Sequence, residues 1–567
     1  MPDRPAPDQH VPDPHMDGVR APDLVSPDLV SLVLAAADRY GDAPALTGPQ
    51  APAGPLGRLA GIGRSARTGW RHAHRRRSAP GREVRARTLT YTERGERVRA
   101  VASRLQSAGF GPGQRMLFSV RPSPDAVVLA LGTVAAGGTV VFVDPGVGPA
   151  LFAARTELAA PGWAAAESVL YAAGRGPLRA LARRRGVLLP AYSRLPVQHV
   201  RAGRWLPGVP RGAVPLWDLV RPVPRVELPA DPGQDAVVVF TAGTTAAPKA
   251  VVHTRGSLGA ALGVLSTRCA LGPGTRVHTD QFLLGLPALV DGGHWSMPPY
   301  GFAPAARPDE LATGLAGATH TFLVPADLAA VLDAVRDGRV ALPDSLRQVL
   351  LGAAPVLPPL LRRATAALPG VEFLAVYGMT EILPVAIATA AEKLAHRGPG
   401  DLVGTPLPGV RARVDDEGRL VVAGANLARG YLGEADLAEH TTGDLATLTG
   451  DGAIVLCGRA TDMIIRGHTN IYPGLYEPAI SALPGVAQAV LVGVPDEIGD
   501  ERVVLVLVAA PAAPPGLVTR VRDALPALLD ASALPDEVVE VDDVPVAGRT
   551  RKTDRATLRD RLARELG

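Results

Sequence analysis

Residues 236–258 read AVVVFTAGTTAAPKAVVHTRGSL, an apolar run that leads directly into a loop of small and hydroxyl side chains. The run predicts a buried strand, and the loop after it ends at a lysine. Small residues let successive backbone N–H groups turn toward an anion, while hydroxyls and a lysine add donors and charge. This composition favours a polyphosphate cradle built from Thr241, Gly243, Thr244, Thr245 and Lys249. It is not a Walker loop, because no GxxxxGK[ST] occurs, and taken alone it reads equally well as an ordinary turn.

The segments around this loop predict alternating helices and strands. Thr90 and Glu93 have the spacing of a capping box, apolar residues follow at helical spacing, and Gly109 is placed as a C-terminal cap. An apolar helix over residues 126–138 and a β-branched strand over 139–146 come next. The pattern predicts an α/β fold, with a large N-terminal domain of mostly parallel sheets covered by helices. Beyond residue 463, short strands around one helix predict a small, mobile α+β domain.

Composition narrows the class of protein. The chain has 567 residues and 47% hydrophobic content, more than one core usually organises, so we expect at least two domains. A formal net charge of +4, from 59 basic and 55 acidic residues, argues against a nucleic acid partner for the whole surface. Only Cys269 and Cys457 occur, which suits a reducing, cytoplasmic setting. No run of about 18 apolar residues is free of charge, Pro and Gly, so we expect no transmembrane segment.

Two stretches differ from the rest of the chain. Residues 1–23 are rich in Pro and Asp, and we expect a disordered tail. Residues 51–88 gather many arginines, which is typical of a solvated insertion, although a peripheral contact with acidic membrane or nucleic acid is the alternative. The remaining chain divides into a large domain over residues 24–462 and a small one over 463–567.

Five further motifs follow the loop in order: GAAPV from Gly352, VYGMTE to Glu381, TGDL from Thr442, GRATDMIIRG to Gly467, and RKTDR around Lys552. Together with TAGTTAAPKA they resemble the signatures of the adenylate-forming, AMP-binding superfamily of acyl-CoA synthetases, peptide-synthetase adenylation domains and luciferases. The resemblance spans residues 24–560 and implies that family's fold and its activation of carboxylic acids with ATP. Six ordered motifs in one chain are specific where any one is weak.

The resemblance implies a role for each matched position. The implied catalytic residues are Thr244, Glu381 and Lys552. Glu381 is also the implied Mg²⁺ ligand, because a hard cation needs an oxygen ligand beside the triphosphate. The implied ATP-binding residues are those of the phosphate loop together with Gly352, Ala353, Ala354, Tyr377, Thr380, Asp444 and Arg459. Tyr377 is placed against the adenine, and Asp444 and Arg459 beside the ribose. Alone, the last two read equally well as a turn aspartate and a surface arginine.

Three positions near the end of the chain have implied roles, Lys552 in adenylation and Asp462 and Gly467 in the change to the second half-reaction. Lys552, in a charged tail that otherwise reads as solvated, is expected to reach the cleft and stabilise charge on the carboxylate and α-phosphate. Asp462 is the implied hinge between two states of the small domain, a role that suits little packing and tolerant dihedrals. Gly467 would line a tunnel for the thiol.

The chain also departs from the family's pattern. Ala242 stands where Ser is common, and Ala246 and Ala250 where Gly is common, which removes a hydroxyl donor and disfavours positive φ. Around Gln281 and Phe282, where many members of the family have an aromatic residue or a histidine at the acyl pocket, this sequence has no matching histidine. Leu475 replaces the first of two usual glutamates, which leaves Glu477. We expect these changes to affect substrate choice and domain docking more than ATP chemistry.

The sequence therefore predicts an AMP-forming acid–thiol ligase that uses ATP, Mg²⁺ and coenzyme A as co-substrate, with a carrier protein acting in trans as another possible acceptor. Leu and Ala around residues 281–290 and 381–390 favour a fatty acyl substrate. One alternative is a β-lactone synthetase acting on β-hydroxy acids, which FVDPG at Phe142 and YGMTEILPVA at Tyr377 resemble. Another is a non-catalytic acyl-adenylate-binding protein, which the alanine substitutions suggest and the retained charged residues oppose.

Overall fold

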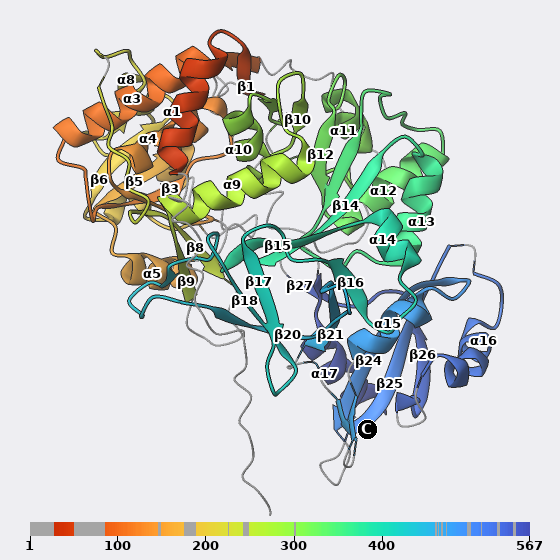
Figure 1. The fold of residues 1–567 in the computed structure, drawn as a ribbon. Coiled ribbons are helices and arrows are strands. Elements are labelled where there is room, and N and C mark those ends of the chain that lie inside the picture. The colour runs from red at the N-terminus through yellow and green to blue at the C-terminus, as the bar shows by residue number, and fades with distance from the viewer. Residues whose placement is uncertain are drawn as a thin grey trace, which may run out of the picture.

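The computed structural model describes most of the chain, in these ranges: residues 28–49, 86–145, 149–174, 189–224, 226–241, 249–299, 302–459, 462, 464–466, 469–471, 473–495, 501–511, 513–529, 533–547 and 552–566. The expected disordered tail and nearly all of the arginine-rich insertion lie outside these ranges. Figure 1 shows a large N-terminal part, coloured red to teal, and a smaller C-terminal part in blue. The expected fold class, a large α/β domain with a small C-terminal domain, is confirmed.

The large domain contains two eight-stranded sheets. The first sheet is parallel except for antiparallel pairs at its two edges, β14 with β15 and β1 with β2. Its strands, in spatial order, are β15 (Ile382–Thr389), β14 (Glu372–Met379), β13 (Gln348–Leu351), β12 (His320–Leu323), β10 (Arg276–His278), β11 (His294–Ser296), β1 (Pro44–Pro49) and β2 (Ala86–Thr90).

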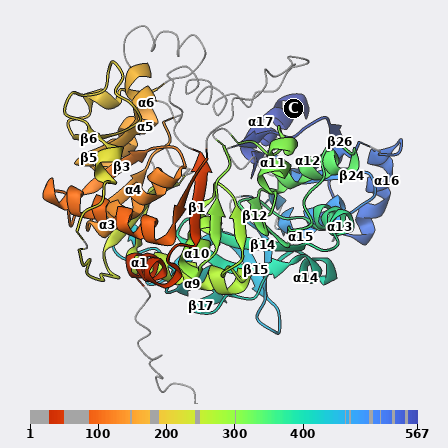
Figure 2. The same cartoon turned by 90° about the horizontal axis from the view of Figure 1, so that it is seen from above.

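The second sheet follows the same plan, with antiparallel pairing only among β19, β9 and β8. Its strands, in spatial order, are β19 (Gly430–Tyr431), β9 (Lys249–Thr254), β8 (Asp235–Thr241), β4 (Thr139–Phe142), β3 (Arg115–Ser119), β5 (Trp163–Glu167), β6 (Gln198–Ala202) and β7 (Val214–Pro215). Figure 2 shows the two halves side by side, the orange and yellow half against the green one. The prediction of mostly parallel sheets is confirmed for both.

A third, five-stranded sheet is antiparallel throughout, and the sequence did not lead us to expect it. Its strands, in spatial order, are β16 (Asp401–Gly404), β21 (Ile454–Arg459), β20 (His440–Leu448), β18 (Arg419–Gly424) and β17 (Val410–Val414). Apolar residues of this sheet, including Leu420 and Ile454, share one buried cluster with Ile382 and Ala386 of β15. The third sheet is thus joined to the first through a common core.

Helices pack on the sheets and bury their apolar sides. Helix α3 begins at the expected capping box, in which the Thr90 hydroxyl accepts from the Glu93 N–H, and Gly109 follows its end with φ +86°. Burial of Val98, Val101 and Leu105 on one side of it explains the apolar spacing. The large-domain helices are α1 (Leu29–Tyr40), α3 (Tyr91–Ser107), α4 (Pro124–Ala135), α5 (Pro149–Ala159), α6 (Ser168–Ala173), α8 (Leu216–Leu219), α9 (Arg255–Cys269), α10 (Phe282–Asp291), α11 (Pro308–Gly314), α12 (Pro325–Arg336), α13 (Pro358–Ala367) and α14 (Ala390–Ala395).

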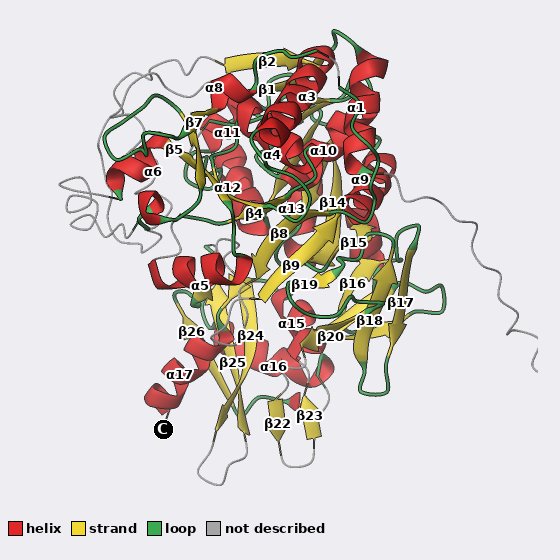
Figure 3. Ribbon diagram, turned by 90° about the vertical axis from the view of Figure 1, so that its left-hand side faces the viewer, coloured by secondary structure: helices red, strands yellow, loops and turns green. Residues whose placement is uncertain are grey.

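The small domain is built around one three-stranded sheet, β24-β25-β26, which Figure 3 shows at the lower end of the molecule with α17 beside it. The strands and the helix expected after residue 500 are present. The elements are β22 (Ile464–Arg466), β23 (Thr469–Ile471), α15 (Pro473–Ser481), β24 (Val486–Pro495), β25 (Glu501–Ala509), α16 (Leu517–Ala524), β26 (Glu537–Val541), β27 (Val546–Ala547), β28 (Lys552–Thr553) and α17 (Arg555–Leu566).

The two domains meet where α15 lies against β21. Backbone approaches backbone there: a Cβ added at Gly474 would stand 2.6 Å from the Cα of Gly458 and 2.6 Å from the carbonyl oxygen of Cys457. Only glycine at position 474 permits this approach. Within the described ranges, no helix is both long enough and apolar enough to span a bilayer.

Candidate nucleotide-binding site

The phosphate-loop motif lies at the turn between two paired strands of the second sheet. Strand β8 ends at Thr241 and β9 begins at Lys249, and these two residues are partners in the antiparallel ladder. Residues 242–248 lie outside the described ranges, and with them Gly243, Thr244 and Thr245. The predicted strand is present as β8, and the exposed Lys249 is the first residue of β9.

Of the three alanines that depart from the family's pattern, Ala250 lies within the described ranges. It is buried in β9, opposite Phe240 in the ladder, and its φ is not positive. Extended backbone accepts any side chain, so Ala250 introduces no strain at this point. Ala242 and Ala246 lie outside the described ranges.

Tyr431 connects the phosphate lysine to the expected metal ligand. Its hydroxyl donates a hydrogen bond of 2.8 Å to Oε1 of Glu381, and its ring centroid lies 5.0 Å from Nζ of Lys249. Burial, and then the hydrogen bond to Glu381, raise the pKa of the Tyr431 phenol, so it remains a donor at neutral pH. Sequence reasoning missed this residue, because its partners lie far away along the chain.

The loop that carries Thr380 and Glu381 is also held from behind by a buried histidine. Nε2 of His253 lies 2.7 Å from the carbonyl oxygen of Thr380, so this nitrogen carries the proton, and Nδ1 lies 3.4 Å from Oγ of Ser257. Burial lowers the pKa of His253, which keeps the imidazole neutral near pH 7. His253 belongs to the stretch over residues 236–258, yet no motif or spacing marks it as a functional residue.

The predicted adenine and ribose residues lie on strands of the first and third sheets. The Tyr377 hydroxyl on β14 donates a hydrogen bond of 2.7 Å to Oδ2 of the buried Asp444 on β20. On the adenine-side loop, Ala353 has φ +65°, a left-handed conformation that costs a non-glycine residue about 1–2 kcal/mol. A Cβ at Gly352 would come within 3.3 Å of the Val376 carbonyl oxygen. This loop, which ends at Ala354, therefore lies close against the strand that carries Tyr377.

Arg459 occupies the ladder position opposite Asp444. The backbone therefore places it next to the other residue that we expect beside the ribose. Its side chain lies outside the described part of the structure. His440, on β20 with Asp444, was not expected at the site. Burial lowers its pKa, Lys249 lowers it further, and Glu381 and Asp444 act in the opposite direction. One imidazole is thus influenced by the phosphate, metal and ribose residues together.

Two of the three positions singled out near the end of the chain lie in the described ranges. Lys552 is exposed on β28, opposite Ala547 in a short hairpin, and Gly467 falls outside the described residues. We expected little packing around Asp462, and the structure differs: its Oδ2 lies 3.2 Å from Nε of Arg555. Arg555 also binds Glu477 at 2.6 Å, and the Leu491 carbonyl oxygen accepts from it. The remaining glutamate, Glu477, therefore serves the interior of the small domain.

Lysine is rare in this chain, whereas arginine is common. Lys249, Lys393 and Lys552 are the only three lysines in the sequence. Lys393 is buried on α14, forms an ion pair with Asp401 and donates to the carbonyl oxygen of Leu402 at 2.8 Å. The other two lysines are exposed and occupy positions that the motifs single out.

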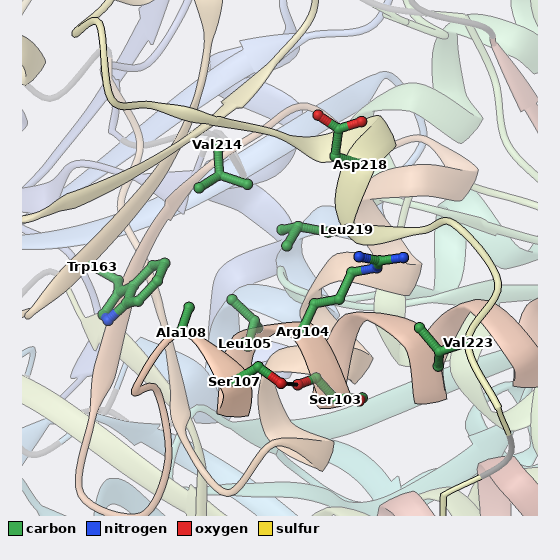
Figure 4. Close-up of a pocket in the computed structure, with 10 residues that line it drawn as sticks. All are labelled: Ser103, Arg104, Leu105, Ser107, Ala108, Trp163, Val214, Asp218, Leu219 and Val223. Carbon is green, nitrogen blue, oxygen red and sulfur yellow. Dashed lines mark hydrogen bonds between the residues drawn. The ribbon is translucent and has the colours of Figure 1, made fainter.

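The expected acyl-pocket segments are packed into the core. Leu284 and Ala288 of α10 and Ile382 and Ala386 of β15 belong to one buried cluster, and Phe282 stacks edge-on against Trp295. The hollow drawn in Figure 4, about 390 Å³, lies elsewhere, between α3 and α8, where the motif residues are absent from its lining. It does not belong to the nucleotide site.

The site's donor set fits a magnesium ion held mainly by its nucleotide. Among the described residues, no group of three or more His, Cys, Asp and Glu side chains is placed to bind a metal. Mg²⁺ in nucleotide sites typically takes one or two carboxylates and completes its shell with phosphate oxygens and water. Glu381 has one carboxylate oxygen bonded to Tyr431 and a second, Oε2, to offer.

Comparison with known proteins identifies the family of the chain. A family profile of AMP-binding enzymes matches residues 69–432, and a profile of the AMP-binding enzyme C-terminal domain matches residues 476–552. The chain therefore belongs to the AMP-binding enzyme family, as its motifs led us to expect.

Named relatives vary in what they act on. The chain is 29% identical over 482 residues to the fatty acid–[acyl-carrier-protein] ligase ScoC of Streptomyces coeruleorubidus, which covers 78% of this chain and 86% of that protein. It is 29% identical over 435 residues to a feruloyl-CoA synthase of an Amycolatopsis species, covering 72% and 81%. It is also 27% identical over 506 residues to tyrocidine synthase 3 of Brevibacillus parabrevis, covering 83% of this chain but only 7% of that protein.

Solved structures share the fold. The amide bond synthetase McbA from Marinactinospora thermotolerans superposes with a TM-score of 0.71 and 23% identity, covering 94% of this chain and 99% of that one. An anthranilate CoA ligase, AuaEII, in complex with anthranoyl-AMP, has a TM-score of 0.71 and 17% identity, covering 96% and 99%. At these identities the likeness concerns the fold alone.

Proposed function

We propose that this chain activates a carboxylic acid with ATP as an acyl-adenylate and transfers the acyl group to a thiol. The observation that carries the proposal is the pair of contacts across the site: Tyr431 joins Lys249 to Glu381, and Tyr377 joins the adenine side to Asp444. The residues proposed for phosphate, metal and ribose thus come from different sheets of the large domain and are linked by these two tyrosines. Family membership supports this assignment.

In the proposed reaction a carboxylate oxygen of the acid attacks the α-phosphorus of ATP. The new P–O bond forms as the bond from the α-phosphorus to the oxygen bridging to the β-phosphorus breaks, and pyrophosphate leaves with that electron pair. Lys249 holds the phosphates, Asp444 the ribose hydroxyls, and Lys552 meets the charge that develops around the α-phosphorus. Mg²⁺, held by Glu381, neutralises phosphate charge when bound. Gly243, Thr244 and Thr245 are proposed to bind the phosphates with Lys249. Thr380 is proposed to bind nucleotide beside Glu381, and Arg459 to lie beside the ribose.

The second half-reaction is thiolysis. The thiolate sulfur attacks the acyl carbon and AMP leaves, which gives a thioester. Coenzyme A is the proposed thiol, with Asp462 as hinge and Gly467 in its tunnel, and a carrier-protein thiol in trans is the second candidate. The likeness to ScoC, whose name gives a fatty acid and an acyl carrier protein, supports a fatty substrate and the second acceptor. A cytoplasmic location accords with both acceptors.

Acid-dependent pyrophosphate release tests the proposal. Purified chain with Mg·ATP is offered aliphatic, 3-hydroxy and aromatic acids, with and without coenzyme A, beside the Lys552→Ala variant. We expect release with a fatty acid and a thioester once coenzyme A is added. Turnover of 3-hydroxy acids without any thiol would replace this proposal by a β-lactone synthetase. Nucleotide binding without release from any acid would instead indicate the non-catalytic adenylate-binding protein.

A further inference from the structure

Tyr431 is fixed in place by backbone contacts on both of its sides. It pairs with Val251 of β9, and the N–H groups of its neighbours Arg429 and Leu432 donate to the carbonyl oxygens of Val252 at 2.9 Å and Ala250 at 2.8 Å. The same segment reaches the metal-ligand loop, because the N–H of Ala428 donates to the Glu381 carbonyl oxygen at 2.7 Å. The backbone of Tyr431 is therefore held beside both β9 and the loop that carries Glu381.

The two charged side chains on either side of this ring are opposite in sign and do not pair. Lys249 and Glu381 both lie in the described part of the chain, and the contact each makes at the site is with Tyr431 rather than with the other. Opposite charges near one another attract, and the exposed ammonium group of Lys249 could otherwise close onto Glu381 as an ion pair. A closed pair would occupy the cation meant for phosphate and the carboxylate meant for the metal.

We propose that Tyr431 is a spacer that holds Lys249 and Glu381 apart, so that both charges remain available to bound nucleotide. The ring satisfies the ammonium group through its π face, and the hydroxyl satisfies one carboxylate oxygen, which leaves Oε2 of Glu381 for the cation. This is a positioning role within the proposed function. This role requires both an aromatic ring and a hydroxyl at position 431. Phenylalanine would lack the hydroxyl, and leucine would lack both.

The shortage of lysine makes the proposal directly measurable. An amine-reactive reagent, quantified by peptide mass spectrometry, reports separately on Lys249, on the exposed Lys552 and on the buried Lys393. In Tyr431→Leu the spacer is lost, and we expect labelling of Lys249 at pH 8 to fall roughly two- to fivefold. The reason is that an ion pair with a carboxylate favours the protonated, unreactive amine, and an exposed pair is worth up to about 1 kcal/mol.

A double variant and an internal reference make the test decisive. Glu381→Gln in the Tyr431→Leu background removes the ion-pair partner and should restore labelling of Lys249. Labelling of Lys552 should stay constant, and protection of Lys393 shows that the fold is intact. Equal labelling of Lys249 in the wild-type chain and in Tyr431→Leu, with Lys393 protected, would overturn the spacer role, and so would a double variant that fails to restore it.

The conservative variant separates the ring from the hydroxyl. Tyr431→Phe keeps the ring over Lys249, so its labelling should be unchanged, while the Mg²⁺-dependent gain in ATP affinity, measured by calorimetry, should fall about tenfold. Tyr171→Phe is a matched control, since its hydroxyl lies 3.2 Å from Nδ1 of His199 in another buried cluster. An unchanged Mg²⁺ dependence in Tyr431→Phe would contradict the proposal. Neither measurement needs turnover, so the spacer role can be refuted while acid-dependent pyrophosphate release is observed, and it can be supported while no release is observed.

Discussion

The nucleotide face of the large domain and the tail of the small domain hold their charged groups differently. On the large domain, Asp444 and Glu381 each accept a hydrogen bond from a tyrosine that a strand holds in place. On the small domain, Lys552 is exposed on a two-residue strand, and the neighbouring Arg555 is tied inward to Glu477 and Asp462. The first arrangement suits groups that bind a ligand at rest, and the second suits a group that acts only at one stage.

This contrast predicts that variants of the tail change rate and variants of the face change affinity. The largest effect is expected for Lys552→Ala, which removes a donor from developing charge and should slow adenylation about 10²–10³-fold. ATP affinity should stay within about twofold, because the face is untouched. Single-turnover pyrophosphate release and calorimetry measure the two quantities. A Lys552→Ala chain that loses ATP affinity instead would erase the distinction.

Asp444→Asn should give the reverse result. Replacing a charged acceptor of ribose hydroxyls by a neutral amide is expected to weaken ATP binding about 10–100-fold, since hydrogen bonds to charged groups are worth about 1.5–3 kcal/mol. The rate at saturating ATP should change far less. Asp337→Asn, on the exposed surface beside Arg336 and Arg339, is the matched control and should leave both quantities unchanged. A normal Kd for ATP in Asp444→Asn would refute the ribose role.

Acid should destabilise the large domain before the small one. Burial, and then Arg276, lower the pKa of His278 to about 4, below the unfolded value near 6.5. Between these values the unfolded chain binds more protons, so stability is complete above pH 6.5 and is lost as pH falls toward 4, by about 2 kcal/mol at pH 5.

Denaturant titrations at pH 7.5 and 5 measure this loss through tryptophan fluorescence, because all five tryptophans precede residue 300. His278→Asn should reduce the difference, and the rest comes from other groups such as His294, whose pKa burial also lowers to about 4. No histidine lies in the described part of the small domain, so hydrogen exchange there should respond less to acid. Equal acid sensitivity of both domains would contradict the prediction that acid destabilises the large domain first.

The smallest effect is expected for Tyr377→Phe. It removes one donor from Asp444 and keeps the ring, so ATP affinity should fall about fivefold, corresponding to about 1 kcal/mol for a single hydrogen bond. Calorimetry of ATP binding measures it beside Asp444→Asn. A loss as large as that of Asp444→Asn would mean that Tyr377 does more than orient the carboxylate.

The local parts of the fold could be predicted from the sequence. A capping box, an apolar helix and a β-branched strand are decided by neighbours within a few residues, and the strand over residues 236–240 was predicted from its own apolar run. The third sheet was not predicted. Asp451 and Gly452 between β20 and β21 are typical turn residues, but no local signal indicates that β18 pairs with β20 or β16 with β21.

The site divides in the same way. Lys249, Glu381 and Asp444 were found through motifs, whereas Tyr431 and His253 gain their meaning only from partners 50 and 127 residues away. Neither residue has a spacing that marks it, and a lone tyrosine or a lone buried histidine is ordinarily part of a core. Contacts over such distances are set by the packing of sheets, which no single segment specifies.

The bare backbone contact between Gly474 and Gly458 gives an engineer a graded control over how the two domains meet. A single methyl group at position 474 would enter space 2.6 Å from the Cα of Gly458, so the domains would have to part locally to admit it. Successively larger side chains there act as wedges of increasing thickness. Such a series would convert domain orientation, usually a property inferred after the fact, into a variable set by one codon.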